Sequence, residues 1–249
     1  MTLLRNLLAA SAAMTLAVGA AQAADVKNIV LVHGAYADGS GWKGVYDILV
    51  KDGYKVSIVQ QPLTSLTDDV AATKRILDLQ DGPVVLVGHS YGGQIITDAG
   101  ADKNVKALVY VAALQPEVGD SVISLASTME LPNKDVKETP DGFLYLDPAT
   151  FAADFAADLP ADLSGFMAIS QMPVAKLAFT QTTKVASWHD KPSYGIVATK
   201  DIALNADLER WMYKRSGAKV TEIDASHAVF ISQPQAVADV IEEAARNAK

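Results

Sequence analysis

The sequence predicts a single domain of the α/β class, in which a mostly parallel, twisted sheet is flanked by helices. Three observations carry this prediction. Short apolar runs alternate with stretches of helical periodicity, which is typical of a parallel sheet with crossover helices. One apolar run leads through a glycine turn that bears a serine directly into a helix. The 249 residues, half of them hydrophobic, are enough for one domain with a sizeable core.

Residues 1–23 are expected to be a secretory signal peptide. Arg5 is their only charged side chain, an uncharged apolar stretch follows it, and Ala21-Gln22-Ala23 has the small-x-small pattern of a cleavage site. The apolar stretch of about 14 residues is short of the ~20 that span a bilayer. The absence of cysteine excludes a lipoprotein anchor. The mature domain, residues 24–249, is therefore expected to be periplasmic or secreted, without a stable membrane anchor.

Composition excludes several kinds of site. Without cysteine there is no disulfide, no thiolate metal site and no cysteine nucleophile. The chain has 21 basic and 29 acidic side chains, and one basic residue is lost with the signal peptide. No basic cluster interleaved with aromatic residues occurs, so we expect no nucleic-acid partner.

The first half of the domain begins with two strands, each followed by a helix. Residues 28–32 and 55–59 are the expected strands. Residues 42–51 carry apolar side chains on one helical face. Residues 67–80 form the second expected helix, with Thr67 as its N-cap and acidic residues in its first turn.

Residues 83–93 predict a strand that ends in a Gly-x-Ser-x-Gly turn and enters a helix extending to about residue 100. Such a turn lifts a serine hydroxyl onto a strained bend that a substrate and a general base can both reach. Gly88 and Gly92 lie two residues on either side of Ser90, where a Cβ would crowd the turn. By chance a chain of this size yields roughly 0.1 such matches. The flanking strand and helix therefore make Ser90 the candidate nucleophile.

Residues 105–113 form another expected strand, after which the pattern changes. From about 115 to 191 no strand of comparable strength occurs, and six prolines separate short helical pieces. Phe151, Phe155 and Leu159 recur every four residues, which predicts one helix with an apolar stripe. The segment's other large apolar side chains are Phe166, Met167, Met172, Leu177 and Phe179. We expect a helical cap that walls an apolar pocket over the serine.

The sheet is expected to resume after this segment. Residues 194–199 and 219–223 are the last two strands. A helix over 206–216 separates them, with Gly217 as its C-terminal stop. Residues 235–248 form a closing amphipathic helix.

A serine nucleophile needs a general base, and the chain offers four histidines. His89 is adjacent to Ser90, so its side chain should diverge at the tight turn. His33 suits a loop position, and His189 lies in a polar, solvated loop. His227 follows the last strand, at the sheet edge where Ser90 lies and where open α/β sheets place their active sites. We therefore predict His227 as the base.

The acid that orients the base should lie on the same edge. Asp201 directly follows the strand 194–199, so its carboxylate can reach the second ring nitrogen of His227. The other acidic residues expected near this edge, which could also orient His227, are Asp224, Glu117 and Asp120. Asp201 is favoured over them, and Asp224 is interpreted as a solvated loop residue.

A tetrahedral intermediate needs two backbone N–H donors directed at its oxyanion. Tyr91, the residue after the nucleophile, should supply one. The loop after the first strand should supply the other, and Ala35 is the best candidate. We expect Gly34 to permit the unusual backbone angles of that loop.

The order Ser90, Asp201, His227 is that of the α/β-hydrolase fold, and the whole mature chain resembles that superfamily. The matching pieces are His33-Gly34-Ala35, Gly88-His89-Ser90-Tyr91-Gly92-Gly93, Asp201 after a strand, and Ser226-His227-Ala228. The resemblance implies a helical cap inserted after the sixth strand. The glycine turn and the segment 201–211 look most like the small branch that contains plant methyl-ester esterases, hydroxynitrile lyases and bacterial esterases.

Two positions separate esterases from lyases in that branch. The lyases carry a lysine just after the histidine, where this chain has Ala228, and a threonine in the first loop, where it has Gly34. The resemblance therefore favours ester hydrolysis. Relatives of the fold that cleave haloalkanes or epoxides use an aspartate nucleophile, which Ser90 excludes.

The sequence thus predicts a serine esterase that acts on small-molecule esters through an acyl-enzyme intermediate and needs no metal or organic cofactor. The same triad is compatible with lactonase, perhydrolase or hydroxynitrile-lyase-like activity. A catalytically silent ligand-binding protein is the alternative outside enzyme chemistry.

Overall fold

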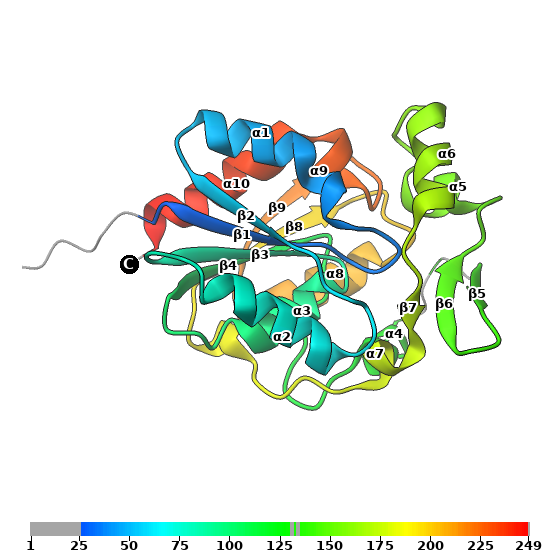
Figure 1. Ribbon diagram of the computed structural model, residues 1–249, viewed down its shortest axis with the longest axis horizontal. Coiled ribbons are helices and arrows are strands. Elements are labelled where there is room, and N and C mark those ends of the chain that lie inside the picture. Colours follow the sequence, from blue (N-terminus) through cyan, green and yellow to red (C-terminus); the bar gives the residue numbers. More distant parts are fainter. Residues whose placement is uncertain (1–25, 130–131, 133–134, 249) are drawn as a thin grey trace, which may run out of the picture.

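A parallel sheet is the centre of the fold in the computed structural model, which describes residues 26–248 except 130–131 and 133–134. The predicted signal peptide, residues 1–23, lies outside the described residues. Six strands in that range pair in the order β2-β1-β3-β4-β8-β9, all parallel (Figure 1). They are β1 (Asn28–Val32), β2 (Lys55–Val59), β3 (Val84–His89), β4 (Val105–Val111), β8 (Ser193–Ala198) and β9 (Lys219–Ile223).

Helices cover both faces of this sheet. Figure 1 shows α1 and α10 on one side of the strands and α2 and α3 on the other. The helices of the body are α1 (Lys43–Lys51), α2 (Leu66–Leu77), α3 (Gly92–Ala99), α8 (Ala206–Ser216), α9 (Val229–Ser232) and α10 (Pro234–Asn247), and the 3-10 turn η1 (Gly39–Trp42) precedes α1. The α/β prediction is confirmed.

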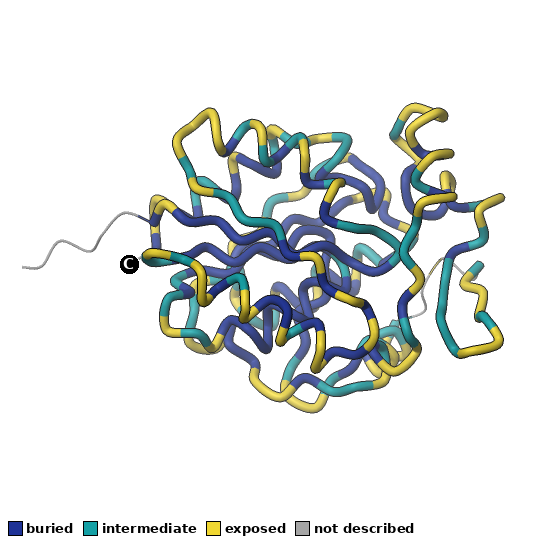
Figure 2. Tube along the Cα trace, viewed as in Figure 1, coloured by how far each residue is buried: buried dark blue, intermediate teal, exposed yellow. Residues whose placement is uncertain are grey.

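Strand alternation divides the core between the two faces. In β1, Ile29 and Leu31 join the cluster made with α1 and α10, whereas Val30 and Val32 join the cluster made with α2, α3 and α8. All five residues of β1 are buried, and Figure 2 shows the central strands as the most deeply buried part of the chain. Burial on both faces explains why these strands are apolar runs without alternation in the sequence.

The ends of two helices test the capping predictions. Thr67 is wrong as the cap of α2: the helix begins at Leu66, and the Ser65 hydroxyl accepts the Asp68 backbone N–H at 3.0 Å. Ser65 has the extended backbone that an N-cap requires, and a residue inside the helix does not. Gly217 ends α8 with a φ of +70°, the left-handed conformation typical of a C-terminal glycine.

The insertion leaves the sheet after β4, which is the fourth strand along the chain and not the sixth, because only β8 and β9 follow it. It is also not wholly helical, since β5, β6 and β7 form an antiparallel sheet of three strands. Its elements are α4 (Val122–Ala126), β5 (Val136–Glu138), β6 (Phe143–Leu146), α5 (Phe151–Phe155), α6 (Ala161–Ser170), β7 (Val174–Ala175), α7 (Lys176–Thr180) and the 3-10 turn η2 (Ser187–His189). Figure 1 shows β5 to β7 and α4 to α7 gathered beyond one end of the parallel strands. We call this segment the cap.

The helix expected to run through Leu159 is shorter than predicted. It ends at Phe155, and Pro160 then starts α6 as its N-cap. The residue before a proline is disfavoured in helical backbone, so Leu159 cannot continue the helix easily. Leu159 still packs on the cluster formed by Phe151 and Phe155.

None of the helices among the described residues is long and apolar enough to cross a membrane.

Candidate active site

Ser90 occupies a strained turn at the carboxyl end of β3. Its φ is +54°, a left-handed value that is uncommon for a residue with a side chain. The turn is held by backbone hydrogen bonds, since the Ser90 carbonyl accepts the N–H of Gly93 at 2.9 Å and that of Leu114 at 3.1 Å. The strained turn is therefore held by the first turn of α3 and by the segment that follows β4, as expected at a functional bend.

The two glycines that flank Ser90 are required because neither position has room for a Cβ atom. A Cβ on Gly88 would lie 2.5 Å from the Gly92 carbonyl oxygen, and a Cβ on Gly92 would lie 2.7 Å from the His33 carbonyl oxygen. Both distances are below any ordinary contact with a backbone atom. The interpretation of these glycines as a steric requirement is confirmed.

The structure brings His227 and Asp201 together. The Nδ1 atom of His227 lies 2.5 Å from the Asp201 Oδ2 atom, and both side chains are buried. The other oxygen, Oδ1, accepts the backbone N–H groups of Ala203 at 2.9 Å and Leu204 at 2.8 Å. These two donors fix the carboxylate plane, so Oδ2 is directed at the imidazole. Ser90 lines the same cavity as His227.

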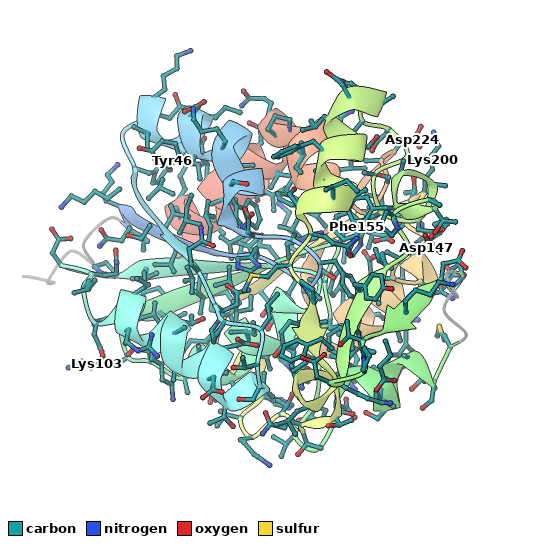
Figure 3. The ribbon with its side chains drawn as sticks, turned by 45° about the vertical axis from the view of Figure 1, so that its right-hand side comes forward. Tyr46, Lys103, Asp147, Phe155, Lys200 and Asp224 are labelled. Carbon is teal, nitrogen blue, oxygen red and sulfur yellow. The ribbon has the colours of Figure 1, made fainter. Side chains whose placement is uncertain are left out.

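The rival acids have other partners. Asp224 is exposed and forms an ion pair with Lys200 at 2.7 Å, and Figure 3 shows the two labelled side by side. Glu117 pairs with His189 at 2.9 Å. Asp120 lies 3.4 Å from Arg215. The structure therefore places only Asp201 of the four candidate acids on His227.

Ala35 and Tyr91, the predicted oxyanion donors, line the same cavity as Ser90. Among the described residues, no hydrogen bond takes up the backbone N–H of either one. The expected role of Gly34 was wrong, however, because its φ does not lie in the left-handed region and it is Tyr36 that adopts +60°. Gly34 is needed for space, since a Cβ there would lie 2.7 Å from the Ser90 Cβ.

His89, which the sequence analysis did not favour as a base, makes contacts that the sequence did not reveal. It is fully buried, and its Nε2 lies 3.0 Å from the His227 backbone carbonyl, to which it donates. Burial first, and then the proximity of His227, keep the pKa of His89 well below its usual value, so the ring is neutral. Its ring also lies 4.6 Å from the His227 ring. His89 thus supports the backbone and the ring of the predicted base.

A buried carboxyl group anchors Tyr91, the residue after the predicted nucleophile. The Tyr91 hydroxyl donates to Asp69 Oδ2 at 2.8 Å, and the Leu63 backbone N–H donates to Oδ1 at 2.8 Å. Burial raises the pKa of Asp69 to about 6, although both hydrogen bonds oppose that shift. The contact joins α2 to the turn that contains the Tyr91 N–H.

We expect the stability difference between the wild type and Asp69→Asn to depend on pH. The pKa of Asp69 is 3.8 ordinarily and about 6 in the folded protein, so the folded state binds this proton more tightly. The contribution of Asp69 to the free energy of unfolding is fully present below pH 3.8 and is lost as the pH rises through about 6. The loss is on the order of 3 kcal/mol. Urea unfolding from about pH 4.5 to about pH 7.5 should show the wild type losing stability relative to the variant. A difference that stays constant over this range would contradict the assignment.

The cavity in front of Ser90 has a volume of about 210 Å³ and is mainly apolar. Phe155 and Phe179, two of the predicted cap side chains, line it. Phe166 and Leu177 do not, because they are exposed elsewhere on the cap. Further apolar lining comes from Leu114, Val122, Ile123, Ala126, Val136, Leu144, Leu146, Ala203 and Leu204, and none of the described lining residues is an aspartate, glutamate, lysine or arginine.

The cap is hydrogen bonded directly to the loop that carries His227, the predicted base. The Ala228 backbone N–H donates to the Phe155 carbonyl at 3.0 Å, and the Ser226 hydroxyl bonds the Asp158 carboxylate. The Phe155 ring lies edge-on to His227 at 4.8 Å, and Figure 3 labels Phe155 where the cap meets the body. Ala228 itself is fully buried. The cap and the predicted base are therefore positioned by the same contacts.

Comparisons with known proteins agree with this architecture. Residues 29–240 match the alpha/beta hydrolase family. The chain is 25% identical to the pyrethroid hydrolase of Sphingobium wenxiniae, over 87% of this chain and 86% of that protein. It is 24% identical to methylesterase 2 of Arabidopsis thaliana, over 86% and 94% respectively. A crystal structure of a pyrethroid hydrolase from Sphingobium faniae superposes with a TM-score of 0.76 at 21% identity, covering 89% of this chain and 98% of that one.

Proposed function

The chain belongs to the alpha/beta hydrolase family, and from that premise we propose that it is a serine esterase for neutral carboxylic esters with small to medium apolar groups. Relatives with the names methylesterase and pyrethroid hydrolase support ester hydrolysis as the reaction. The observation that carries the proposal is the buried His227–Asp201 pair, in which His227 lines the same apolar cavity as the strained Ser90 turn.

The proposed reaction begins when His227 Nε2 accepts the Ser90 hydroxyl proton as Oγ attacks the ester carbonyl carbon. The carbonyl oxygen becomes an oxyanion, stabilised by the Ala35 and Tyr91 N–H groups. Collapse of the tetrahedral intermediate breaks the bond to the alcohol oxygen, which takes the proton from His227 and leaves the acyl group on Ser90. Water then attacks the acyl-enzyme, with His227 again accepting the proton. Collapse of the second tetrahedral intermediate breaks the bond to Ser90 Oγ, which takes the proton from His227, and the acid departs. Asp201 stabilises the imidazolium in both halves.

The cavity lining favours a neutral substrate. Burying a charged group without a partner is strongly unfavourable, and the described lining residues offer no charged partner apart from His227 in its protonated form. Apolar contacts with Phe155, Phe179 and Leu114 instead favour an aliphatic or aromatic group. The cavity volume of about 210 Å³ limits the size of that group.

A panel of p-nitrophenyl esters tests the proposal. We expect the purified protein to hydrolyse the acetate, butyrate and hexanoate, with kcat/KM rising with chain length until the cavity is filled. The hemisuccinate resembles the butyrate in length but carries a carboxylate, so it should be at least about 10-fold poorer. Release of p-nitrophenolate gives the rates. Folded protein that turns over none of these esters, or that prefers the hemisuccinate, would contradict the proposed substrate class.

A further inference from the structure

A second buried carboxyl group lies against the acid of the triad. Glu209, on α8, has no exposed surface, and Asp201 is only 5% exposed. The carboxyl groups of the two side chains lie near enough to interact directly, and neither oxygen of Glu209 has another hydrogen-bond partner among the described residues. The neighbouring Arg210 is turned away, since its guanidinium pairs with Glu222 at 2.8 Å and with Asp207 at 2.7 Å on the surface. Helix α8 therefore places the Glu209 carboxyl group near Asp201, and the adjacent Arg210 forms its ion pairs elsewhere.

Two adjacent buried carboxyl groups cannot both be ionised, so one of them holds a proton. The hydrogen bonds identify which one. Asp201 is directed at three N–H donors, which are His227 Nδ1 and the backbone N–H groups of Ala203 and Leu204. A carboxylate with this many donors is favoured in its charged form. Neither oxygen of Glu209 has a well-formed hydrogen bond from an N–H or O–H donor among the described residues. The proton accordingly belongs on Glu209.

We propose that Glu209 is a positioning residue of the triad, a neutral carboxylic acid whose O–H donates to the Asp201 carboxylate. The inference rests on the proposed function, because it assigns Glu209 a role in the same triad. Through this contact Asp201 gains a fourth donor, while the two carboxyl groups together carry one negative charge. His227 therefore faces a single carboxylate that accepts hydrogen bonds from protein donors, and not a doubly charged pair.

The other groups that face Glu209 are consistent with its neutral form. Burial first, and then the charge of Asp201 and the hydrogen bond to it, raise the pKa of Glu209 well above its usual value. The Ala198 backbone N–H and the charge of Arg210 act in the opposite direction, but with smaller effects. Burial also raises the pKa of Tyr213, so that phenol stays neutral beside Glu209. Its hydroxyl donates to the Ala113 carbonyl at 2.8 Å.

Two substitutions separate a neutral Glu209 from an ionised one. Glu209→Gln keeps a neutral donor of the same shape, and Glu209→Met removes the donor without adding charge. Asp207→Asn, an exposed acid on the same helix, is the matched control. For each protein we would measure kcat/KM for a p-nitrophenyl ester against pH, together with the infrared carbonyl band of protonated carboxylic acids.

We expect Glu209→Gln to leave the acid limb of the pH profile in place and to lower kcat/KM by less than about 3-fold, because one neutral donor replaces another. Glu209→Met should move the acid limb to higher pH by about half a unit to one unit, because Asp201 loses a donor and attracts the imidazolium more strongly. Both should lose one protonated-carboxyl band that the control retains.

The proposal is overturned if Glu209→Gln moves the acid limb to lower pH by about one unit, since that is the effect of removing an ionised neighbour of the base. It is also overturned if wild type and Glu209→Gln show the same infrared bands. The infrared comparison requires no turnover, so its outcome is independent of the proposed ester hydrolysis. Should Glu209→Met fail to fold, the glutamine variant still decides both points.

Discussion

Ser90→Ala should lower kcat for p-nitrophenyl butyrate by about a million-fold, the effect of removing the nucleophile from a Ser-His-Asp triad. The change removes only the hydroxyl oxygen, so no acyl-enzyme can form. The contacts that hold the turn are backbone hydrogen bonds and remain in the variant. We therefore expect the free energy of unfolding to change by less than about 1 kcal/mol.

Steady-state hydrolysis and urea unfolding check both parts of this prediction. The unfolding curve is the control, because a variant that is merely misfolded would also lose activity. Retention of wild-type turnover by folded Ser90→Ala would rule out Ser90 as the nucleophile.

Asp201→Asn should lower kcat by about 10⁴-fold with little change in fold. The reason lies in the two oxygens of Asp201. Oδ1 is held by the N–H groups of Ala203 and Leu204, so an asparagine will keep its oxygen there and present its NH₂ group to His227. Nδ1 of His227 must then accept a hydrogen bond, which shifts the ring proton to Nε2. An imidazole with a proton on Nε2 cannot accept one from Ser90.

Asp224→Asn is the matched control for this substitution. It makes the same chemical change in an acid that is close to His227 in sequence but exposed and paired with Lys200. We expect its kcat to stay within about 2-fold of the wild type, since isolated surface ion pairs contribute little. A large loss in Asp224→Asn together with normal kinetics in Asp201→Asn would reverse the assignment of the acid.

The parts of the fold that the sequence predicted well are those governed by local patterns. The buried strands are continuous apolar runs, and β9 and α8 have the predicted limits. The errors arose where local signals compete. Thr67 and Ser65 can both cap a helix, and only the backbone conformation distinguishes them. The small cap strands, with two to four residues each, are too short to leave a periodic signal.

The candidate site was predictable to the extent that topology places residues. Ser90, Asp201 and His227 each follow a strand of one parallel sheet, so they share an edge whatever the packing. The supporting contacts could not be predicted in this way. His89 and the His227 carbonyl are 138 residues apart in the chain, and Glu209 looks like any polar residue of an amphipathic helix. Their roles depend on the side-chain packing, which a single sequence does not specify.

The most direct test of the central claim, that Ser90 is an activated nucleophile, is labelling with a fluorophosphonate. Intact-mass measurement after brief exposure should show one adduct per chain, and peptide mapping should place it on Ser90. Ser90→Ala should not be labelled, and Asp201→Asn should be labelled far more slowly than wild type and Asp224→Asn. A folded wild-type protein that takes up no label, or takes it up at another residue, would contradict the account and leave a silent ligand-binding protein as the better description.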